Sequence, residues 1–340
     1  MPKKVRILAL VHDHLVPPED TTGIDILEAE WKMEYDVIET LRERGHTVQV
    51  LGIHDDLSGI RPSAEDFKPH IVVNLMEAFA GVTTFDQNVV SYLELLRLPY
   101  TGCNPRGLVL ARDKALSKKL LAYHRIRVPE FVVVRPGRKP VLPKRLAFPM
   151  IVKSLFFEAS AGISQASVVE NHDQLARRVS FIHEKLGTAA IVEQFVDGRE
   201  IYVGVLGNER LEAFPAWEMS FDRMPDNRWK IATERVKWST QYQKKHGIMT
   251  DRARLDPALA EQMQRIAKRT YRALDLNGYA RVDFRMDDEG RMFVLEANPN
   301  PNIAYGEDFA ESAEVSGLSY ERLLERIVAL GLRWEPARTG

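Results

Sequence analysis

The segments Arg281-Val282-Asp283-Phe284 and Phe293-Val294-Leu295-Glu296-Ala297-Asn298 lie on either side of the turn-forming residues Asp287-Asp288-Glu289-Gly290. Apolar, β-branched runs that flank such a turn predict a β-hairpin. Side chains alternate between the two faces of a strand, so Arg281 and Asp283 share one face. Glu296 and Asn298 share a face of the partner strand in the same way. The hairpin can therefore bring one guanidinium, two carboxylates and one amide oxygen together.

The oxygen atoms on this hairpin favour a magnesium site. Mg²⁺ takes hard oxygen ligands and usually completes its shell with water and substrate phosphates, which indicates nucleotide chemistry. The alternative is that Arg281 and Asp283 form an ion pair on an exposed face. The position of Glu296 favours the metal site over the exposed ion pair. Glu296 directly follows the apolar run 292–295, where an unpaired charge would be costly.

The length and composition limit the class of protein. A chain of 340 residues is long enough for two or three domains. Its net charge of −1 gives no indication of a nucleic-acid or membrane-surface partner, and no apolar run approaches the length of a membrane span. The single cysteine, Cys103, excludes an internal disulfide framework and fits a reducing compartment. The apolar run after Lys4 is too short for a signal peptide, so we expect a cytoplasmic protein.

The first hundred residues have the pattern of a doubly wound domain. Apolar runs at 5–11, 48–53 and 71–76 predict buried strands, and apolar residues at helical spacing predict helices over 27–41 and 85–96. Alternating strands and helices predict a parallel sheet with ligands at the carboxyl ends of its strands. This domain is expected to end near Asn104-Pro105.

The remainder mixes strands and helices without internal repeats. We expect helices over 113–124, 172–186 and 257–274 and an amphipathic closing helix through 323–330. Strands are expected at 131–134, 150–153, 163–169, 190–195, 200–206 and 212–217. The stretch 222–247 is polar and gives no clear pattern.

Two further groups of residues are candidates for nucleotide binding. Lys153 ends a strand just before the small-residue segment 158–162, where an ammonium group and free backbone N–H groups can hold phosphates. The alternative is a lysine with its ammonium group in water. Glu193 and Glu200 lie on either side of the turn Asp197-Gly198. Their carboxylates can accept hydrogen bonds from an adenine amino group or ribose hydroxyls, or they are ordinary surface acids.

Taken in order, these pieces resemble the ATP-grasp superfamily, and within it the D-alanine–D-alanine ligase branch of carboxylate–amine ligases. The resemblance extends over most of the chain. It includes Leu95-Leu96-Arg97-Leu98-Pro99-Tyr100-Thr101-Gly102, Asp113-Lys114-Ala115-Leu116-Ser117-Lys118 and Leu295-Glu296-Ala297-Asn298. It implies an α/β and α+β fold of three parts. These are a doubly wound domain (1–104), a central α+β lid (105–190) and a C-terminal α+β catalytic subdomain (191–340).

The resemblance also implies roles for single residues. Lys114 and Lys153 would hold ATP phosphates, and the loop around Ser160 and Gly162 would close over them. Glu193 would bind the adenine amino group with backbone groups of Phe195 and Val196, and Glu200 would bind ribose. Lys237 would approach the γ-phosphate, and Arg281 would stabilise charge during acyl transfer. Asp283, Glu296 and Asn298 would hold two Mg²⁺ ions, with Mn²⁺ as a substitute.

The family activity implied is an ATP-dependent ligase that joins a small-molecule carboxylate to an amine through an acyl phosphate. The substrate is expected to be an amino acid or short peptide, and the resemblance implies a homodimer. Three alternatives stay open: a true D-alanine–D-alanine ligase, a phosphotransferase on the same fold, and a nucleotide-binding regulator that has lost turnover.

The substrate-handling positions depart from that branch. His12-Asp13-His14 replaces a glycine-rich entry with a Ser-x-Glu-type segment, Ala159 stands where a serine is usual, and Trp238 replaces a tyrosine. The run Pro299-Asn300-Pro301-Asn302 replaces Thr-x-Pro-Gly. These differences indicate a substrate other than D-alanine. His12 and His14 lack a third metal ligand, so the pattern favours a polar loop at the substrate cleft over a metal site.

Overall fold

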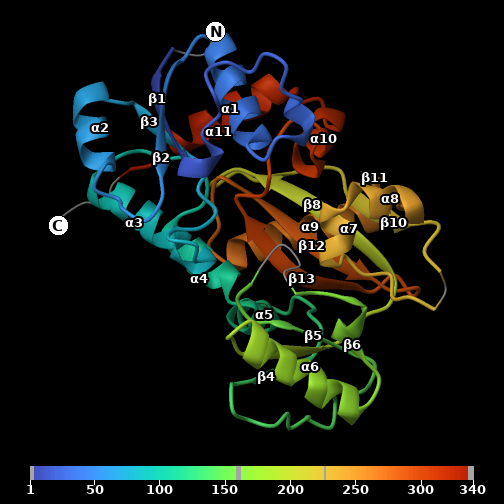
Figure 1. Cartoon of the computed structure of the whole chain (residues 1–340). Coiled ribbons are helices and arrows are strands. Elements are labelled where there is room, and N and C mark those ends of the chain that lie inside the picture. The colour runs from blue at the N-terminus through green and yellow to red at the C-terminus, as the bar shows by residue number, and fades with distance from the viewer. Residues whose placement is uncertain (1–3, 158–161, 226, 336–340) are drawn as a thin grey trace.

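The computed structural model describes residues 4–157, 162–225 and 227–335. This part of the chain forms one parallel and two antiparallel sheets, each accompanied by helices (Figure 1). A parallel N-terminal sheet followed by antiparallel α+β units is the fold class predicted from the sequence. No helix among the described residues combines the length and the apolar character needed to cross a membrane.

The N-terminal sheet has the order β2-β1-β3 and is parallel throughout. It is formed by β1 (Arg6–His12), β2 (Thr47–Ile53) and β3 (Ile71–Asn74), and the accompanying helices are α1 (Lys32–Glu43), α2 (Ile60–Phe67) and α3 (Asp86–Leu95). The strands confirm the predicted doubly wound pattern. Because the carboxyl ends of parallel strands meet at one edge, His12, His54 and Glu77 emerge on the same side.

The last two helices return to this N-terminal unit. They are α10 (Asp308–Val315) and α11 (Tyr320–Gly331). Phe309, Leu323 and Leu324 share a buried apolar cluster with Ile7 and Ile38. The helices α10 and α11 therefore stabilise the N-terminal unit. The predicted closing helix is confirmed.

A four-stranded antiparallel sheet forms a separate small unit, shown in green at the bottom of Figure 1. Its order is β4-β7-β5-β6, from β4 (Phe131–Val134), β5 (Met150–Ser154), β6 (Val168–Val169) and β7 (Ala190–Gln194), with α6 (His172–Lys185) packed against it. The expected strand over 163–169 is largely wrong. Ser164 and Ser167 instead cap a 3-10 turn reciprocally, and only two residues of β6 pair with β5.

The third sheet carries the predicted hairpin. Its order is β11-β10-β8-β12-β13, with β9 beside β8. The strands are β8 (Arg199–Leu206), β9 (Glu212–Ala213), β10 (Trp217–Phe221), β11 (Ile248–Arg252), β12 (Tyr279–Met286) and β13 (Met292–Pro299). α9 (Pro257–Ala273) buries Met263, Ala267 and Tyr271 in the same apolar core as Val282 and Val294.

Several helices differ from the sequence expectation. The helix expected over 113–124 is preceded by a second helix, so that α4 (Pro105–Arg112) and α5 (Lys114–Tyr123) follow one another. The Asp113 carboxylate caps α5 by accepting hydrogen bonds from the N–H groups of Ala115 and Leu116, both at 2.9 Å. The polar stretch contains α7 (Glu234–Trp238) and α8 (Thr240–His246), which were not predicted.

The three sheets resemble the three parts proposed from the sequence. β7 continues to Gln194 within the four-stranded sheet, beyond the proposed limit at 190. The domain limits at 104 and 190 stay a prediction.

Candidate active site

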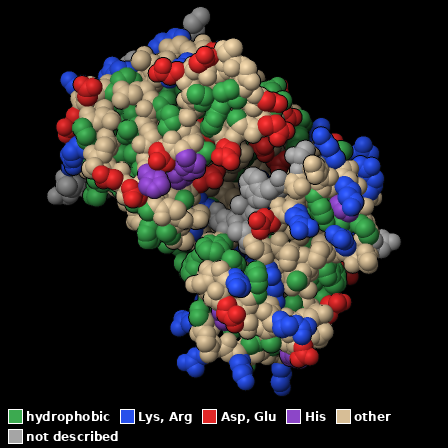
Figure 2. All heavy atoms as spheres, in the orientation of Figure 1, with side chains coloured by type: hydrophobic (Ala, Val, Ile, Leu, Met, Phe, Trp, Pro, Cys, Tyr) green, Lys and Arg blue, Asp and Glu red, His purple; other side chains and the backbone are tan. Residues whose placement is uncertain are grey.

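A cavity of about 1060 Å³ lies between the carboxyl ends of the N-terminal strands and the hairpin face of the six-stranded sheet. Lys237, Arg281, Glu296 and Asn298 line one side of it. Figure 2 shows the hollow between the upper and lower parts of the molecule, with His, Asp and Glu side chains gathered on its upper side. The opposite wall includes His12, His14 and His54, which fits the expectation of a polar loop at a cleft.

Arg281 and Asp283 face one another on β12, as the alternation of the strand predicts. The guanidinium Nε donates to Asp283 Oδ1 at 2.8 Å and Nη2 donates to Oδ2 at 3.0 Å. The Asp283 side chain is only 6% exposed, so the alternative of an ion pair on an exposed surface is wrong. The Arg281 guanidinium also lies 4.6 Å from the centre of the Tyr202 ring. Burial would lower the pKa of Arg281, but Asp283 raises it above its ordinary value.

The strand β13 places its two polar residues opposite this pair. Asn298 pairs in register with Arg281, and Glu296 pairs with Asp283. The Asn298 amide Nδ2 donates to Asp283 Oδ2 at 3.0 Å. Burial alone would raise the pKa of Glu296, but Lys114, Lys153 and Lys237 lower it to about 2. Glu296 is therefore ionised at neutral pH.

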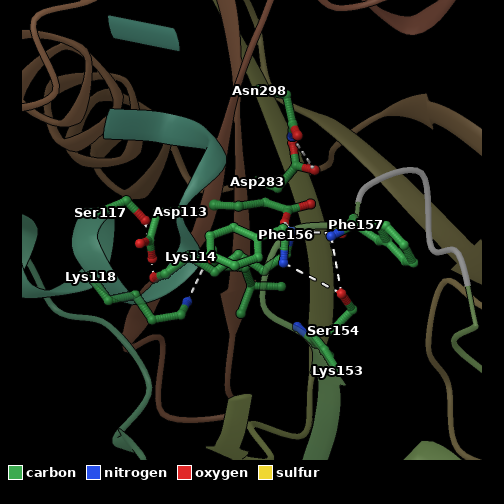
Figure 3. A network of polar contacts seen from close by, with 12 residues as sticks. Asp113, Lys114, Ser117, Lys118, Lys153, Ser154, Phe156, Phe157, Asp283 and Asn298 are labelled. Atoms are coloured by element: carbon green, nitrogen blue, oxygen red, sulfur yellow. Dashed lines mark hydrogen bonds and ion pairs between the residues drawn. The ribbon is translucent and has the colours of Figure 1, made fainter. Parts of the chain in front are cut away.

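Lys114, Lys118 and Lys153 gather near one another (Figure 3). Each lies within ion-pair distance of Glu193 or Glu296. Glu193 on β7 is 1% exposed and lies between Lys118 Nζ at 3.2 Å and Lys153 Nζ at 3.1 Å. Lys114 Nζ lies 3.7 Å from the Glu296 carboxylate. Lys118 was missed, although its position four residues after Lys114 places both on one face of α5.

Charge and burial oppose one another in this cluster. Burial lowers the pKa of Lys114 and of Lys118, and the neighbouring carboxylates counteract part of that effect. Burial would lower the pKa of Lys153 too, but Glu193 and Glu296 raise it. The same two neighbours, Lys118 and Lys153, lower the pKa of Glu193 against the effect of its burial. Lys153 and Glu193 are thus charged near neutral pH.

The loop after β5 connects this cluster to the cleft. The Ser154 hydroxyl accepts hydrogen bonds from the N–H groups of Phe156 and Phe157 at 3.4 and 3.1 Å. The Phe157 carbonyl accepts from Lys114 Nζ at 2.9 Å (Figure 3). Ser160, the predicted loop serine, lies outside the described residues.

Glu200 lies in a second buried pair. Arg285 Nη2 donates to Glu200 Oε2 at 2.7 Å, and the Tyr202 hydroxyl donates to Oε1 at 2.9 Å. Arg285 also donates to the carbonyls of Gly198 and Lys230, at 2.8 and 2.6 Å. Sequence reasoning missed Arg285, yet it follows Arg281 and Asp283 at the same strand alternation and is in register with Glu200.

The remaining residues predicted from the sequence are Phe195, Val196, Gly162 and Lys237. Phe195 and Val196 are buried after β7, and the Phe195 N–H already donates to the Pro149 carbonyl at 3.1 Å. The Gly162 N–H donates to Glu234 Oε2 at 3.3 Å. Lys237 lies on α7 and lines the cavity together with Val236.

The hairpin side chains fit a hard divalent cation in their chemistry. Within the described ranges, no group of three or more His, Cys, Asp or Glu residues could hold a metal ion. A metal here would therefore depend on two carboxylates, the Asn298 amide and oxygens of the nucleotide, which is the pattern expected for Mg²⁺. Asp283 Oδ1 accepts one hydrogen bond from Arg281 and keeps lone-pair capacity. The depressed pKa of Glu296 leaves its carboxylate free of a proton.

A parallel N-terminal sheet, a small antiparallel unit and a larger antiparallel sheet, with charged side chains between them, define the ATP-grasp class of protein. The structure aligns with that of the D-alanine–D-alanine ligase from Bacillus anthracis complexed with ATP, with a TM-score of 0.74 over 97% of this chain and 98% of that one, at 20% identity. A D-alanine–D-alanine ligase from Coxiella burnetii aligns with a TM-score of 0.70 at 19% identity, over 97% of this chain and 94% of that one. These likenesses concern the fold.

The sequence comparisons identify the family. The family model for the D-ala D-ala ligase C-terminus matches residues 120–329. The D-alanine–D-alanine ligase of Desulfotalea psychrophila is 30% identical over 76% of this chain and 78% of its own length. An uncharacterized protein of Sinorhizobium fredii, y4sG, is 32% identical over 87% of this chain and 86% of its own. The chain belongs to the D-alanine–D-alanine ligase family and is an ATP-dependent ligase that forms a C–N bond and releases ADP.

Proposed function

We propose that the chain joins the carboxylate of an amino acid or short peptide to an amine, using ATP and Mg²⁺ and passing through an acyl phosphate. The observation that carries this proposal is the arrangement of the hairpin and the lysine cluster. Asp283, Glu296 and Asn298 lie together on the hairpin, and Lys114 stands 3.7 Å from Glu296. Cationic and metal-binding groups thus border one another beside a cavity large enough for a small substrate.

The first step of such a reaction brings two anions together. A carboxylate oxygen attacks the γ-phosphorus, the bond to the β-phosphate oxygen breaks, and ADP leaves. Lys114, Lys153 and Lys237 are suited to offset the repulsion between the carboxylate and the phosphates. Asp283, Glu296 and Asn298 are suited to hold two Mg²⁺ ions, which when bound neutralise phosphate charge.

The second step needs a group that stabilises negative charge on the acyl oxygen. The amine nitrogen attacks the acyl carbon, loses a proton, and phosphate departs with the electrons of the C–O bond. Arg281 borders the cavity and stays charged beside Asp283, so it is suited to this role. Glu193 contributes to the first step through Lys153, whose charge it maintains.

The proposal is tested by measuring ADP release with amino acids and dipeptides of both configurations, followed by mass spectrometry of the product. We expect a dehydrated conjugate of two substrates. Lys153→Ala and Glu296→Gln should each lower ADP release about 100-fold or more, because each removes charge from the phosphate site. Lys119→Ala is the control, since Lys119 is exposed on the same helix as Lys114. Normal turnover in either of the first two variants contradicts the assigned roles.

A second candidate is a D-alanine–D-alanine ligase, which the names of the relatives favour. It predicts ADP release that depends on D-alanine alone. The substrate-side residues His12 and Asn300, which line the cavity and differ from that branch, favour another substrate. A stable phosphorylated product without an amide supports the phosphotransferase alternative, and ATP binding without turnover supports the regulator.

Assembly and location belong to the same proposal. The family resemblance supports a homodimer, which light scattering during size-exclusion chromatography tests. The use of ATP supports the cytoplasmic location expected from the sequence.

A further inference from the structure

Part of the cavity wall is acidic. Glu77 follows β3 at the carboxyl edge of the N-terminal sheet, and Glu307 precedes α10. Both carboxylates line the cavity together with Asp308. The red side chains at the rim of the hollow in Figure 2 show that acidic groups gather on this side of the molecule.

The cations nearest to this wall already have carboxylate partners. Arg112 donates to Asp86 Oδ2 from Nε at 2.9 Å and from Nη2 at 2.6 Å. Arg281 is bound to Asp283 and lies 3.9 Å from Asp308. Lys32 is bound to Asp36 at 2.6 Å.

Glu77 and Glu307 are exposed beside these pairs and form no ion pair of their own within the described residues. Desolvation raises the pKa of each carboxyl group. Arg112 opposes this effect on the pKa of Glu77 more strongly than Asp86 adds to it. At Glu307, Asp308 adds to the rise in pKa while Lys32 and Arg281 oppose it. A positive charge placed in the cavity would face both carboxylates directly.

Glu34 is an independent sign that a partner is missing. It lies in the first turn of α1, and its side chain shares the buried face with Val37, Ile38 and Leu41. In a β–α unit, the first turn of the helix lies beside the carboxyl ends of the strands, which is the edge where Glu77 emerges. Glu34 is 1% exposed, and its Oε2 has no hydrogen-bond partner among the described residues. Burial, with a contribution from Glu77, raises the pKa of Glu34 to about 7.

From this arrangement we infer that the substrate is cationic: an amino acid or short peptide with a basic side chain, whose ammonium groups bind Glu77 and Glu307. A neutral amino acid offers one ammonium group, whereas the wall presents two carboxylates at the cavity. The buried Glu34 lies close enough to Glu77 for the two charges to repel one another. The reacting carboxylate of the substrate then points toward Arg281 and Lys237. The inference rests on the proposed ligase function, and it assigns specificity to residues outside the phosphate site.

The test compares substrates that differ only in charge. ADP release is measured at about pH 8, where imidazole side chains are ordinarily neutral, with lysine and ornithine and with the neutral analogue norleucine, in both configurations. We expect kcat/KM to be higher for the basic substrates by a factor of about ten or more. The reason is that the side chain of norleucine cannot form a charged hydrogen bond with the acidic wall. Equal values for lysine and norleucine overturn the inference.

The variants Glu77→Gln and Glu307→Gln remove one charge each without changing side-chain size. Each should raise KM for the basic substrate about tenfold while the KM for ATP stays unchanged. In one of the two variants the KM for norleucine should also stay unchanged, because norleucine lacks the side-chain ammonium group. Glu184→Gln is the matched control, because Glu184 is exposed on α6 and does not line the cavity. Unchanged KM values in folded Glu77→Gln and Glu307→Gln, checked by circular dichroism, overturn the assignment.

Binding measurements separate this inference from the ligase proposal. If no substrate releases ADP, the ligase proposal fails, and calorimetric titration with lysine and norleucine in the presence of a non-hydrolysable ATP analogue still decides the inference. Tighter binding of lysine that is lost in Glu77→Gln supports it. Equal or absent binding of both contradicts it.

Discussion

At the residue scale, the lysine cluster beside the hairpin holds a close balance between buried lysines and carboxylates. Glu193 is almost fully buried, and its charge is matched by Lys118 and Lys153. Removing one partner from such a buried group leaves an uncompensated charge, which is more damaging than losing a surface ion pair. Glu193, which the resemblance assigns to the adenine amino group, thus has two ion-pair partners within the protein, and its role toward adenine stays a prediction.

The depressed pKa of Glu296 gives a prediction for stability against pH. Its folded pKa of about 2 lies below the ordinary value of 4.5. The carboxylate therefore stabilises the fold above the ordinary value, and this contribution is lost as the pH falls from about 4.5 toward 2. We expect the free energy of unfolding to fall over that range and to fall less steeply in Glu296→Gln. Urea denaturation at pH 5 and pH 3 measures both slopes, and equal slopes in the two proteins contradict the pKa assigned to Glu296.

At the element scale, the hairpin shows what local sequence can predict. A four-residue turn between alternating apolar runs fixes both the strands and the shared face of Arg281 and Asp283. The same alternation extends to Arg285, whose role was missed because its partner Glu200 lies on β8, far away in the sequence. The pairing is a property of the sheet, and no local pattern encodes it.

Helices without a strong apolar stripe escaped prediction. α7 and α8 lie in a polar segment, and the signals for them are the side chains that cap them: Thr233 accepts from the Val236 N–H at 3.3 Å and Ser239 from the Tyr242 N–H at 3.3 Å. The cluster of Lys118, Lys153 and Glu193 was only partly predictable for another reason. Its members come from α5, β5 and β7, which meet through tertiary packing alone.

The cap of α5 leads to a prediction about the whole helix. Asp113 satisfies the N–H groups of Ala115 and Leu116 at the end that carries Lys114. Asp113→Ala should lower the free energy of unfolding by about 1 kcal/mol and raise KM for ATP, because Lys114 loses its fixed position. Asp113→Asn keeps an oxygen acceptor and serves as the control. Urea denaturation and ADP-release kinetics provide the two readouts, and an unchanged KM in the alanine variant would show that the cap does not position Lys114.

At the scale of the whole molecule, the charged groups of the site come from units that lie far apart in the chain. β5 and β7 of the four-stranded sheet supply Lys153 and Glu193, α5 supplies Lys114, and the six-stranded sheet supplies Asp283, Glu296 and Asn298. On the proposed function, a nucleotide bound among them would contact all of these units at once. Its binding energy should therefore stabilise the assembled arrangement of the sheets, since a ligand that binds only the folded state stabilises it by mass action.

This coupling predicts a metal-dependent gain in thermal stability. A non-hydrolysable ATP analogue with Mg²⁺, at about 100 times its dissociation constant, should stabilise the fold by about 2.7 kcal/mol and raise the melting temperature by roughly 5 °C. Most of the gain should disappear in EDTA and in Glu296→Gln, because the cation offsets the repulsion between the phosphates and the hairpin carboxylates. Glu184→Gln, exposed on α6, should retain it. Differential scanning calorimetry measures the shift. An equal rise without divalent cations would contradict the assignment of the metal site to Asp283, Glu296 and Asn298.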